Sequence, residues 1–508
     1  MSTAAEPTSG GSVLRGGLWY LTSRIVPQFY SLVISVVAAR FLGPHDMGRQ
    51  SLIAFTALTL TTLLTGSLYV ALVRFVGETL GRGRPELVRG LLVWALRIEL
   101  VAAVAGGMVL TAVGLGGGEP KNAWLLAAVV CAVGVLHTLP SAALAGMQRF
   151  RAASVVGLTT GLIGTAATIA VLAAGGGITG MFAVEAAIAF LTLTWTGKLA
   201  RRHVAALAPS PEPARELSRE VARYAAVLTL GVLLTLVVAR RSELFFLERL
   251  STDDQIAHYS IVFAVMTALL YLPQSLAAAI IPAFASLHGE GATERIRSGF
   301  GRALRLLLVL ALPLTAVSAA VGPSVLELVY GEEYRATGTV LLVMIVAYPF
   351  VPLASLGSAL LTGLGRLRLP LLATAVAAAV DVTLAALLVP ELDAVGAAIA
   401  NVGGQVTLAA PLLGAAIRAT GSPRLEAGSL VRAALAAAIA GLCAWAATAL
   451  GGIAGTTVAL LSFGLVFAAL AWALRILPSD DARWLDEAIG SRLGGRLGRA
   501  FLACSTSR

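Results

Sequence analysis

The chain has 508 residues, of which 58% are hydrophobic and only 13% are charged, and its mean hydropathy is +0.87. Soluble globular proteins carry about 25% charged residues, so this composition excludes a soluble enzyme, a disordered scaffold and a collagen-like chain. The net charge of +10 would suggest a nucleic-acid partner in a soluble protein, and the positions of the basic residues must decide its meaning here.

Hydropathy predicts an all-α integral membrane protein, because about 20 apolar residues suffice to cross a bilayer as a helix. We expect about fourteen transmembrane helices, with short loops of Gly, Pro and charged residues between them. In chain order the predicted spans are 18–40, 50–72, 90–114, 123–146, 154–174, 178–199, 222–247, 256–284, 300–321, 338–362, 369–389, 394–417, 429–450 and 453–476.

The loop charges predict the orientation of these spans. With the N-terminus inside, inner segments hold 29 Lys and Arg residues and outer segments hold 7, while Arg97 lies within a span. Cytoplasmic loops carry an excess of Lys and Arg, so both termini are predicted to be cytoplasmic. The basic residues are therefore explained as topology determinants, and we expect no nucleic-acid partner.

Three pairs of segments indicate an internal repeat. Residues 144–151 match residues 361–368 at an offset of 217, residues 175–180 match 391–396 at 216, and residues 42–51 resemble 250–260 at 208 to 209. The matches occur in the same order along the chain. They predict two six-helix lobes in parallel orientation, a recurrent plan of transporters, followed by two extra C-terminal helices.

This plan divides the chain into six segments. They are a cytoplasmic N-terminal segment (1–17), an N-lobe (18–199), a cytoplasmic linker (200–221), a C-lobe (222–417), spans 13 and 14 (418–476) and a cytoplasmic amphipathic tail (477–508). We expect the tail to form an amphipathic helix on the anionic inner leaflet.

Three segments of the chain have the character of loop signatures: ARFLGPHDMG (39–48), LELVYGEEY (326–334), and LVP (388–390) with GAAIA (396–400). These segments resemble those of the Wzx-type polysaccharide flippases, which transport lipid-linked oligosaccharides and belong to the multidrug/oligosaccharidyl-lipid/polysaccharide exporter superfamily. The resemblance covers about residues 12–420 and includes the arrangement of six, six and two helices. It implies that a lipid-linked sugar is flipped by alternating access between the two lobes.

Charged residues within spans are the best candidates for a site, since a charge near the bilayer centre costs at least ~2.5–3.5 kcal/mol and normally faces a wet cavity or a partner. Arg24 is either a cation facing the cavity or an anchor that snorkels to the interface. Span 7 carries Arg240, Arg241 and Glu243, either facing the cavity, paired internally, or beyond the end of a shorter span. We interpret these four residues as substrate-binding.

Two further acids are interpreted as ion-coupling residues. Asp381 lies deep in span 11 and is either coupled to a proton or cation or held as a hydrogen-bonded neutral carboxyl. Glu185 in span 6 and Asn401 in span 12 occupy equivalent positions of the repeat. With Gln28, Asn401 is expected to supply a polar side chain to the cavity.

No nucleophile, base or metal-ligand pattern is recognisable, so we expect a transporter and not an enzyme. Neither a cofactor nor a metal site is predicted apart from coupling to Na⁺ or H⁺, and no Walker-type loop points to ATP as a direct fuel.

The predicted function is to flip a polyprenyl-pyrophosphate-linked oligosaccharide across the bacterial cytoplasmic membrane. The arginines would hold the anionic pyrophosphate by charge-assisted hydrogen bonds. The expected partners are this substrate, membrane lipids and enzymes of polysaccharide biosynthesis. A lipid II flippase and a cation-coupled multidrug exporter of the same superfamily stay open as alternatives. A membrane glycosyltransferase is less compatible, because no outer loop is long enough to hold catalytic carboxylates.

Overall fold

The computed structural model describes residues 10–205, 207, 215–239, 243–366, 368–421 and 426–476. Within these ranges the chain forms α-helices, two short 3-10 helices and no strand. Ten helical stretches in these ranges are long and apolar enough to cross a membrane. One of them, in α13 (Arg368–Thr420), contains two predicted spans, and α1 (Gly10–Thr65) contains the first predicted span and part of the second. The predicted all-α membrane fold is confirmed.

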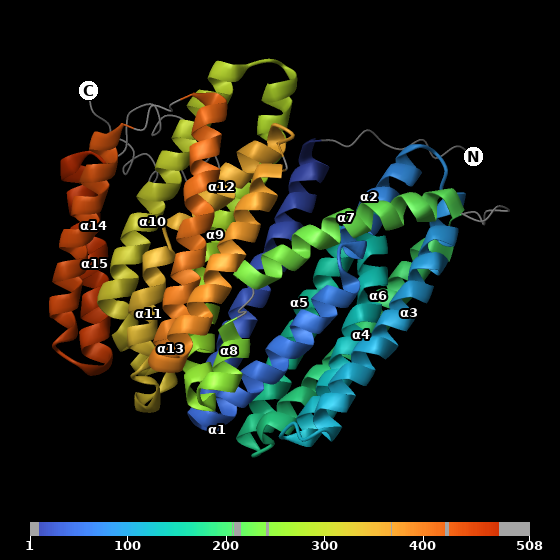
Figure 1. Ribbon diagram of the computed structural model, residues 1–508, viewed down its shortest axis with the longest axis horizontal. Helices are drawn as coiled ribbons and strands as arrows, with labels where there is room; N and C mark the ends of the chain where they lie inside the picture. The colour runs from blue at the N-terminus through green and yellow to red at the C-terminus, as the bar shows by residue number, and fades with distance from the viewer. Residues whose placement is uncertain are drawn as a thin grey trace. The chain divides into compact units, whose positions relative to one another are not determined.

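The chain divides into two compact units, residues 1–241 and 242–508 (Figure 1). In the first unit, buried side chains of α2, α3, α4 and α7 form an apolar core that includes Leu72, Phe75, Leu91 and Leu144. The helices of this unit are α1 (Gly10–Thr65), α2 (Leu68–Gly81), α3 (Glu86–Leu115), α4 (Lys121–Gly146), α5 (Phe150–Ala173), α6 (Gly177–Ala205) and α7 (Arg215–Ala239).

The first two predicted spans are divided differently from the hydropathy pattern. Helix α1 contains a sharp break at Gly43, whose backbone angles (φ 73°, ψ 174°) are not helical. A second break occurs at Gly66 (φ 50°), where the Ser67 N–H donates to the Thr229 hydroxyl of α7 at 3.3 Å. Because this side chain replaces the missing helical partner, the second span continues as α2 to Gly81 instead of ending near residue 72.

The second unit contains the remaining helices. Its elements are α8 (Glu243–Leu250), α9 (Asp253–Gly289), α10 (Thr293–Tyr330), α11 (Thr337–Met344), α12 (Phe350–Gly363), α13 (Arg368–Thr420), α14 (Ala427–Thr448) and α15 (Gly452–Leu474), with 3-10 turns at Glu332–Tyr334 and Ile345–Ala347. Helices α11 and α12 together correspond to the predicted span 338–362. Helix α13 holds spans 11 and 12, separated by a break at Asp393 (φ 50°, ψ −130°).

The two C-terminal helices pack on the second unit. Figure 1 shows α14 and α15 next to each other beside α10, and these contacts are made by small side chains. Ala440, Ala444 and Ala459 are fully buried, and Gly441 lies against Ala316 of α10. Small residues let membrane helices approach closely, which gains packing contacts where no hydrophobic force acts between helices.

The turn after α4 and the turn after α12 have the same hydrogen bonds, at the offset of 217 found in the sequence. Met147, Gln148 and Arg149 donate their N–H groups to Ala143, Ala145 and Leu144, and Leu364, Gly365 and Arg366 donate to Leu360, Thr362 and Leu361. This pattern closes a helix C-terminus with one left-handed residue. The parallel repeat is therefore present in the backbone geometry as well as in the residue types.

The left-handed residue of this turn differs between the two units. It is Gly365 (φ 73°) in the second unit and Gln148 (φ 57°) in the first. A residue with a Cβ pays roughly 1–2 kcal/mol in this region, whereas glycine does not. The turn between the last two spans of each repeat shows the opposite distribution. Its residue with positive φ is a glycine, Gly177 (φ 54°), in the first unit and a residue with a Cβ, Asp393 (φ 50°), in the second.

The Gln148→Gly variant is expected to be more stable than the wild type by about 1 kcal/mol, because it relieves the strain of a left-handed residue with a Cβ. Gln148 is exposed, so no packing is lost. The matched change Gly365→Ala should cost a similar amount, since the added Cβ meets no atom within 4 Å. Thermal midpoints of the detergent-purified variants test the pair, and a lower midpoint for Gln148→Gly would contradict the strain argument.

The structure covers the six predicted segments unevenly. The tail 477–508 lies outside the described residues, as do residues 1–9 of the N-terminal segment and residues 206 and 208–214 of the predicted linker. Helix α6 extends to Ala205 and α7 starts at Arg215. The lobe and linker boundaries stay predictions.

Candidate functional site

The three predicted arginines lie outside the part of the chain whose side chains the structure describes. Arg240 and Arg241 lie outside the described residues, and Arg24 lies in α1 in the part for which only the backbone is described. Gln28 is half-buried on α1, and Glu185 is exposed on α6. The roles predicted for these residues stay predictions.

Three of the predicted residues, Glu243, Asp381 and Asn401, come together in the second unit. Glu243 begins α8 and its side chain is fully buried. The Asn401 side-chain amide, on the second half of α13, donates a hydrogen bond of 2.9 Å to Glu243 Oε1. Residues assigned to spans 7 and 12 are thus joined by a buried polar contact, in a region where unpaired polar groups are costly.

Asp381 completes the cluster from the first half of α13. It is fully buried, and it packs against Gly404 so closely that a Cβ at this glycine would lie 3.1 Å from Asp381 Cβ. Gly404 and Asn401 are three residues apart and share one face of the helix. Asp381 is consequently near enough to Glu243 for the two carboxylates to interact electrostatically, and the Tyr259 hydroxyl of α9 also interacts with Glu243.

The internal repeat explains why this cluster belongs to one unit only. In the first unit, Gly164 occupies the position that corresponds to Asp381. It faces Ile188 of α6, and a Cβ added at Gly164 would lie 3.3 Å from Ile188 Cγ1. Ile188 in turn corresponds to Gly404 at an offset of 216. In the first unit, Ile188 of α6 fills the space next to Gly164 of α5. In the second unit the large and small residues are exchanged: Asp381 on the first half of α13 fills the space next to Gly404 on the second half.

The chemistry of the cluster favours a bound cation or proton. Two carboxylates buried together repel each other, and burial disfavours their charged forms. A proton or a small cation would remove both penalties. The available donor atoms are carboxylate oxygens, a carboxamide oxygen and a phenol oxygen, which are hard ligands suited to hard cations such as the alkali and alkaline-earth ions.

Sequence reasoning identified the acids and the amide but missed Tyr259 and Gly404. The Gly403–Gly404 pair within an apolar span is the signal that could have marked a close helix contact. Tyr259 stands in an apolar stretch of α9, and its position in the sequence gives no such signal. A further buried acid, Glu99 on α3, is only 1% exposed and belongs to the first unit, separate from the cluster.

The family comparison decides the classification. The model of the family described as "Polysaccharide biosynthesis protein" matches residues 13–288, more than half of the chain. The chain belongs to this family. A second model, MatE, matches residues 242–387, which include α8 and Asp381. No curated protein matches the chain.

Solved structures of similar fold are transporters. A structure of the lipid II flippase MurJ in an inward closed conformation has a TM-score of 0.67 at 13% identity, covering 94% of this chain and 100% of that chain. An inward-facing multidrug resistance MATE family transporter of the MOP superfamily has a TM-score of 0.66 at 16% identity, covering 80% and 98%. A MOP superfamily transporter from Pyrococcus furiosus has 0.56 at 15%, covering 79% and 95%.

These likenesses confirm the fold expected from the sequence and the resemblance to the exporter superfamily. The protein is a multi-span membrane protein with the MOP superfamily transporter fold, and its family is the polysaccharide biosynthesis family. At 13–16% identity the structural neighbours show the fold alone.

Proposed function

We propose that the protein flips a polyprenyl-pyrophosphate-linked oligosaccharide across the bacterial cytoplasmic membrane by alternating access. The observation that carries this proposal is the family match over residues 13–288, on a chain with a transporter fold. Both termini are cytoplasmic in this proposal, as the loop charges predict. The enzymes that assemble the oligosaccharide would supply the substrate on the inner face.

The buried cluster of Glu243, Asp381 and Asn401 is proposed to couple transport to Na⁺ or H⁺. This proposal keeps the coupling role predicted for Asp381 and moves Glu243 from the predicted substrate-binding role to coupling, because its side chain is bonded to Asn401. A ligand can shift a conformational equilibrium only through a difference in its affinity for the two states. Neutralising two buried carboxylates supplies such a difference, because the cluster is stable in its packed form only when a cation or proton offsets the repulsion. Glu185 on α6 is the alternative coupling residue.

The substrate pyrophosphate is proposed to bind Arg24, Arg240 and Arg241. Guanidinium groups form paired charge-assisted hydrogen bonds with phosphate oxygens. Glu243 follows Arg241 by two residues, which would place the substrate-binding and ion-binding residues of span 7 next to each other in the chain.

Replacing Arg24, Arg240 or Arg241 with alanine is expected to reduce flipping about tenfold or more, since a hydrogen bond to a charged group is worth about 1.5–3 kcal/mol. The measurement is the rate at which a fluorescent polyprenyl-pyrophosphate oligosaccharide becomes protected from an external quencher in proteoliposomes. Arg432→Ala is the matched control, because Arg432 is exposed on α14, outside the twelve repeated spans. Wild-type rates in the triple variant would contradict the role of the arginines.

The same vesicles discriminate between the candidate substrates. The MurJ neighbour is a lipid II flippase and the MATE neighbour a multidrug resistance transporter, so lipid II and an organic cation are the two comparison substrates. Protection of the oligosaccharide lipid alone supports the proposal. Protection of lipid II alone, or export of the organic cation alone, would replace it with the corresponding alternative.

A further inference from the structure

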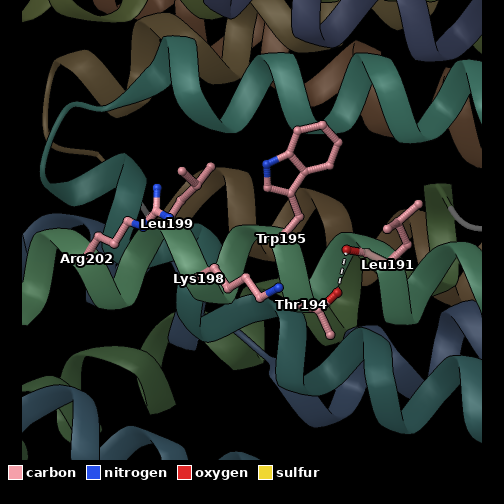
Figure 2. A pocket seen from close by; sticks show the side chains of 6 residues that line it. All are labelled: Leu191, Thr194, Trp195, Lys198, Leu199 and Arg202. Atoms are coloured by element: carbon pink, nitrogen blue, oxygen red, sulfur yellow. Dashed lines mark hydrogen bonds between the residues drawn. The ribbon is translucent and has the colours of Figure 1, made fainter.

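A pocket of about 340 Å³ lies along one face of α6, near the end of the helix that precedes the predicted linker. The described residues that line it all belong to this helix, and Figure 2 shows their side chains on the α6 ribbon. They are Leu191, Thr194, Trp195, Lys198, Leu199 and Arg202. None of these residues belongs to the proposed substrate-binding or coupling residues.

The polar end of the pocket carries two cations, and no described acidic side chain forms an ion pair with either of them. Lys198 and Arg202 are four residues apart, so they lie on the same side of the helix, and both are exposed. Among the described residues neither forms an ion pair. Lys198 is also one of two lysines in a chain whose other 35 basic residues are arginines. Two neighbouring positive charges favour an anionic ligand.

The remainder of the pocket is apolar and aromatic. Leu191 and Leu199 line it together with the half-buried Trp195. The Thr194 hydroxyl donates to the Leu191 carbonyl at 3.0 Å, so this polar group is already satisfied within the helix (Figure 2). The twelve residues from Leu191 to Arg202 extend about 16 Å along the helix axis, about half the thickness of the hydrocarbon core.

The order of side chains along the helix matches the depth profile of a lipid. Tryptophan is enriched where the hydrocarbon meets the headgroups, and Lys and Arg extend from there towards the phosphates. A ligand with an apolar chain, a glycerol-like middle and an anionic head would contact Leu191, Trp195 and the two cations in turn. A soluble anion would use only the last of these contacts.

We propose that this pocket binds an anionic phospholipid of the inner leaflet, with the phosphate held by Lys198 and Arg202 and an acyl chain against Leu191 and Trp195. The proposal is independent of the transported substrate. Basic residues close to a membrane surface attract anionic lipids, and here two of them are fixed on one rigid helix beside an aromatic residue.

Native mass spectrometry of the full-length protein in detergent tests the proposal, with phosphatidylglycerol and phosphatidylcholine of identical acyl chains as probes. The wild type is expected to bind phosphatidylglycerol about tenfold more tightly than phosphatidylcholine. The double variant Lys198→Gln, Arg202→Gln should lose this preference. Arg201→Gln is the matched control, because Arg201 is exposed next to the pair but does not line the pocket.

A third probe and a charge-conserving variant make the result decisive. Lys198→Arg should keep the preference for phosphatidylglycerol, because it keeps the positive charge. If this variant keeps the preference and the double variant loses it, the preference is due to charge. Equal affinity for the two phospholipids in the wild type, or an unchanged preference in the double variant, would overturn the proposal. Tight binding of polyprenyl phosphate without phosphatidylglycerol binding would overturn it in favour of the lipid carrier.

Discussion

The Asp381→Asn variant is expected to lose the dependence of transport on an ion gradient, with a fall in the driven flipping rate of at least about tenfold. The substitution keeps the shape of the side chain but removes one of the two buried charges that a cation or proton would neutralise. Flipping is measured in proteoliposomes under an imposed Na⁺ gradient and, separately, under a pH gradient. The gradient that drives the wild type identifies the coupling ion.

The same variant gives a binding readout that does not depend on transport. If Na⁺ binds the cluster, it stabilises the folded wild type by about 2.7 kcal/mol at a hundredfold excess over the dissociation constant. Asp381→Asn should show no midpoint shift between NaCl and KCl at equal ionic strength. Glu391→Gln is the control, because Glu391 is exposed on the same helix. Full activity of Asp381→Asn with unchanged gradient dependence would remove Asp381 from the mechanism.

A parallel change at Glu185 separates the two predicted coupling residues. Glu185 corresponds to Asn401 in the repeat but is exposed, whereas Asn401 is buried and bonded to Glu243. Loss of gradient dependence in Asp381→Asn but not in Glu185→Gln would assign coupling to the second unit. The opposite result would assign it to the first.

The Gly396→Ala variant is expected to fold poorly, with a loss of about 3 kcal/mol or more in stability. A Cβ at this buried position would lie 2.6 Å from the Leu388 carbonyl carbon and 2.9 Å from the Val389 nitrogen. Both obstacles are backbone atoms, which cannot rotate away. The chain would have to change its path around the break at Asp393, which the Ser251 hydroxyl holds by donating to Asp393 Oδ1 at 2.5 Å.

Two other glycines serve as controls for this prediction. Gly180 is the counterpart of Gly396 in the first unit, but its added Cβ would be close only to the Val171 side chain, which can adjust. Gly464 on α15 has no atom within 4 Å of an added Cβ. Folded yield and thermal midpoint should fall sharply for Gly396→Ala, moderately for Gly180→Ala and not at all for Gly464→Ala. Equal effects at Gly396 and Gly464 would contradict the steric argument.

Most of the fold was predictable because a chain that crosses the membrane many times requires a regular pattern of apolar runs and charged loops. Each span needs a long apolar run, and each loop carries the charges that orient it. The break at Gly66 was not predictable, since it depends on Thr229, a residue 162 positions away that accepts the Ser67 N–H. Hydropathy reports the cost of leaving water and contains no information about such long-range contacts.

The candidate site was predictable in part. A carboxyl within an apolar run is conspicuous, so Asp381 and Glu243 were identified from the sequence. Their neighbourhood was not, because it arises when Gly404 lets the two halves of α13 approach and Asn401 reaches Glu243. Tyr259 was also not predictable, because only the packing of α9 brings it to Glu243.

By itself, the sequence predicted that the net charge of +10 reflects loop arginines, and it determined that the chain crosses the membrane repeatedly and that its two halves are related. These properties follow from composition and from local order along the chain. Only the tertiary structure decided which polar residues meet. Glu243, Asp381 and Asn401 lie within one unit because the repeat placed Gly404 where the first unit has Ile188, and the space thus left between the helices holds a carboxylate.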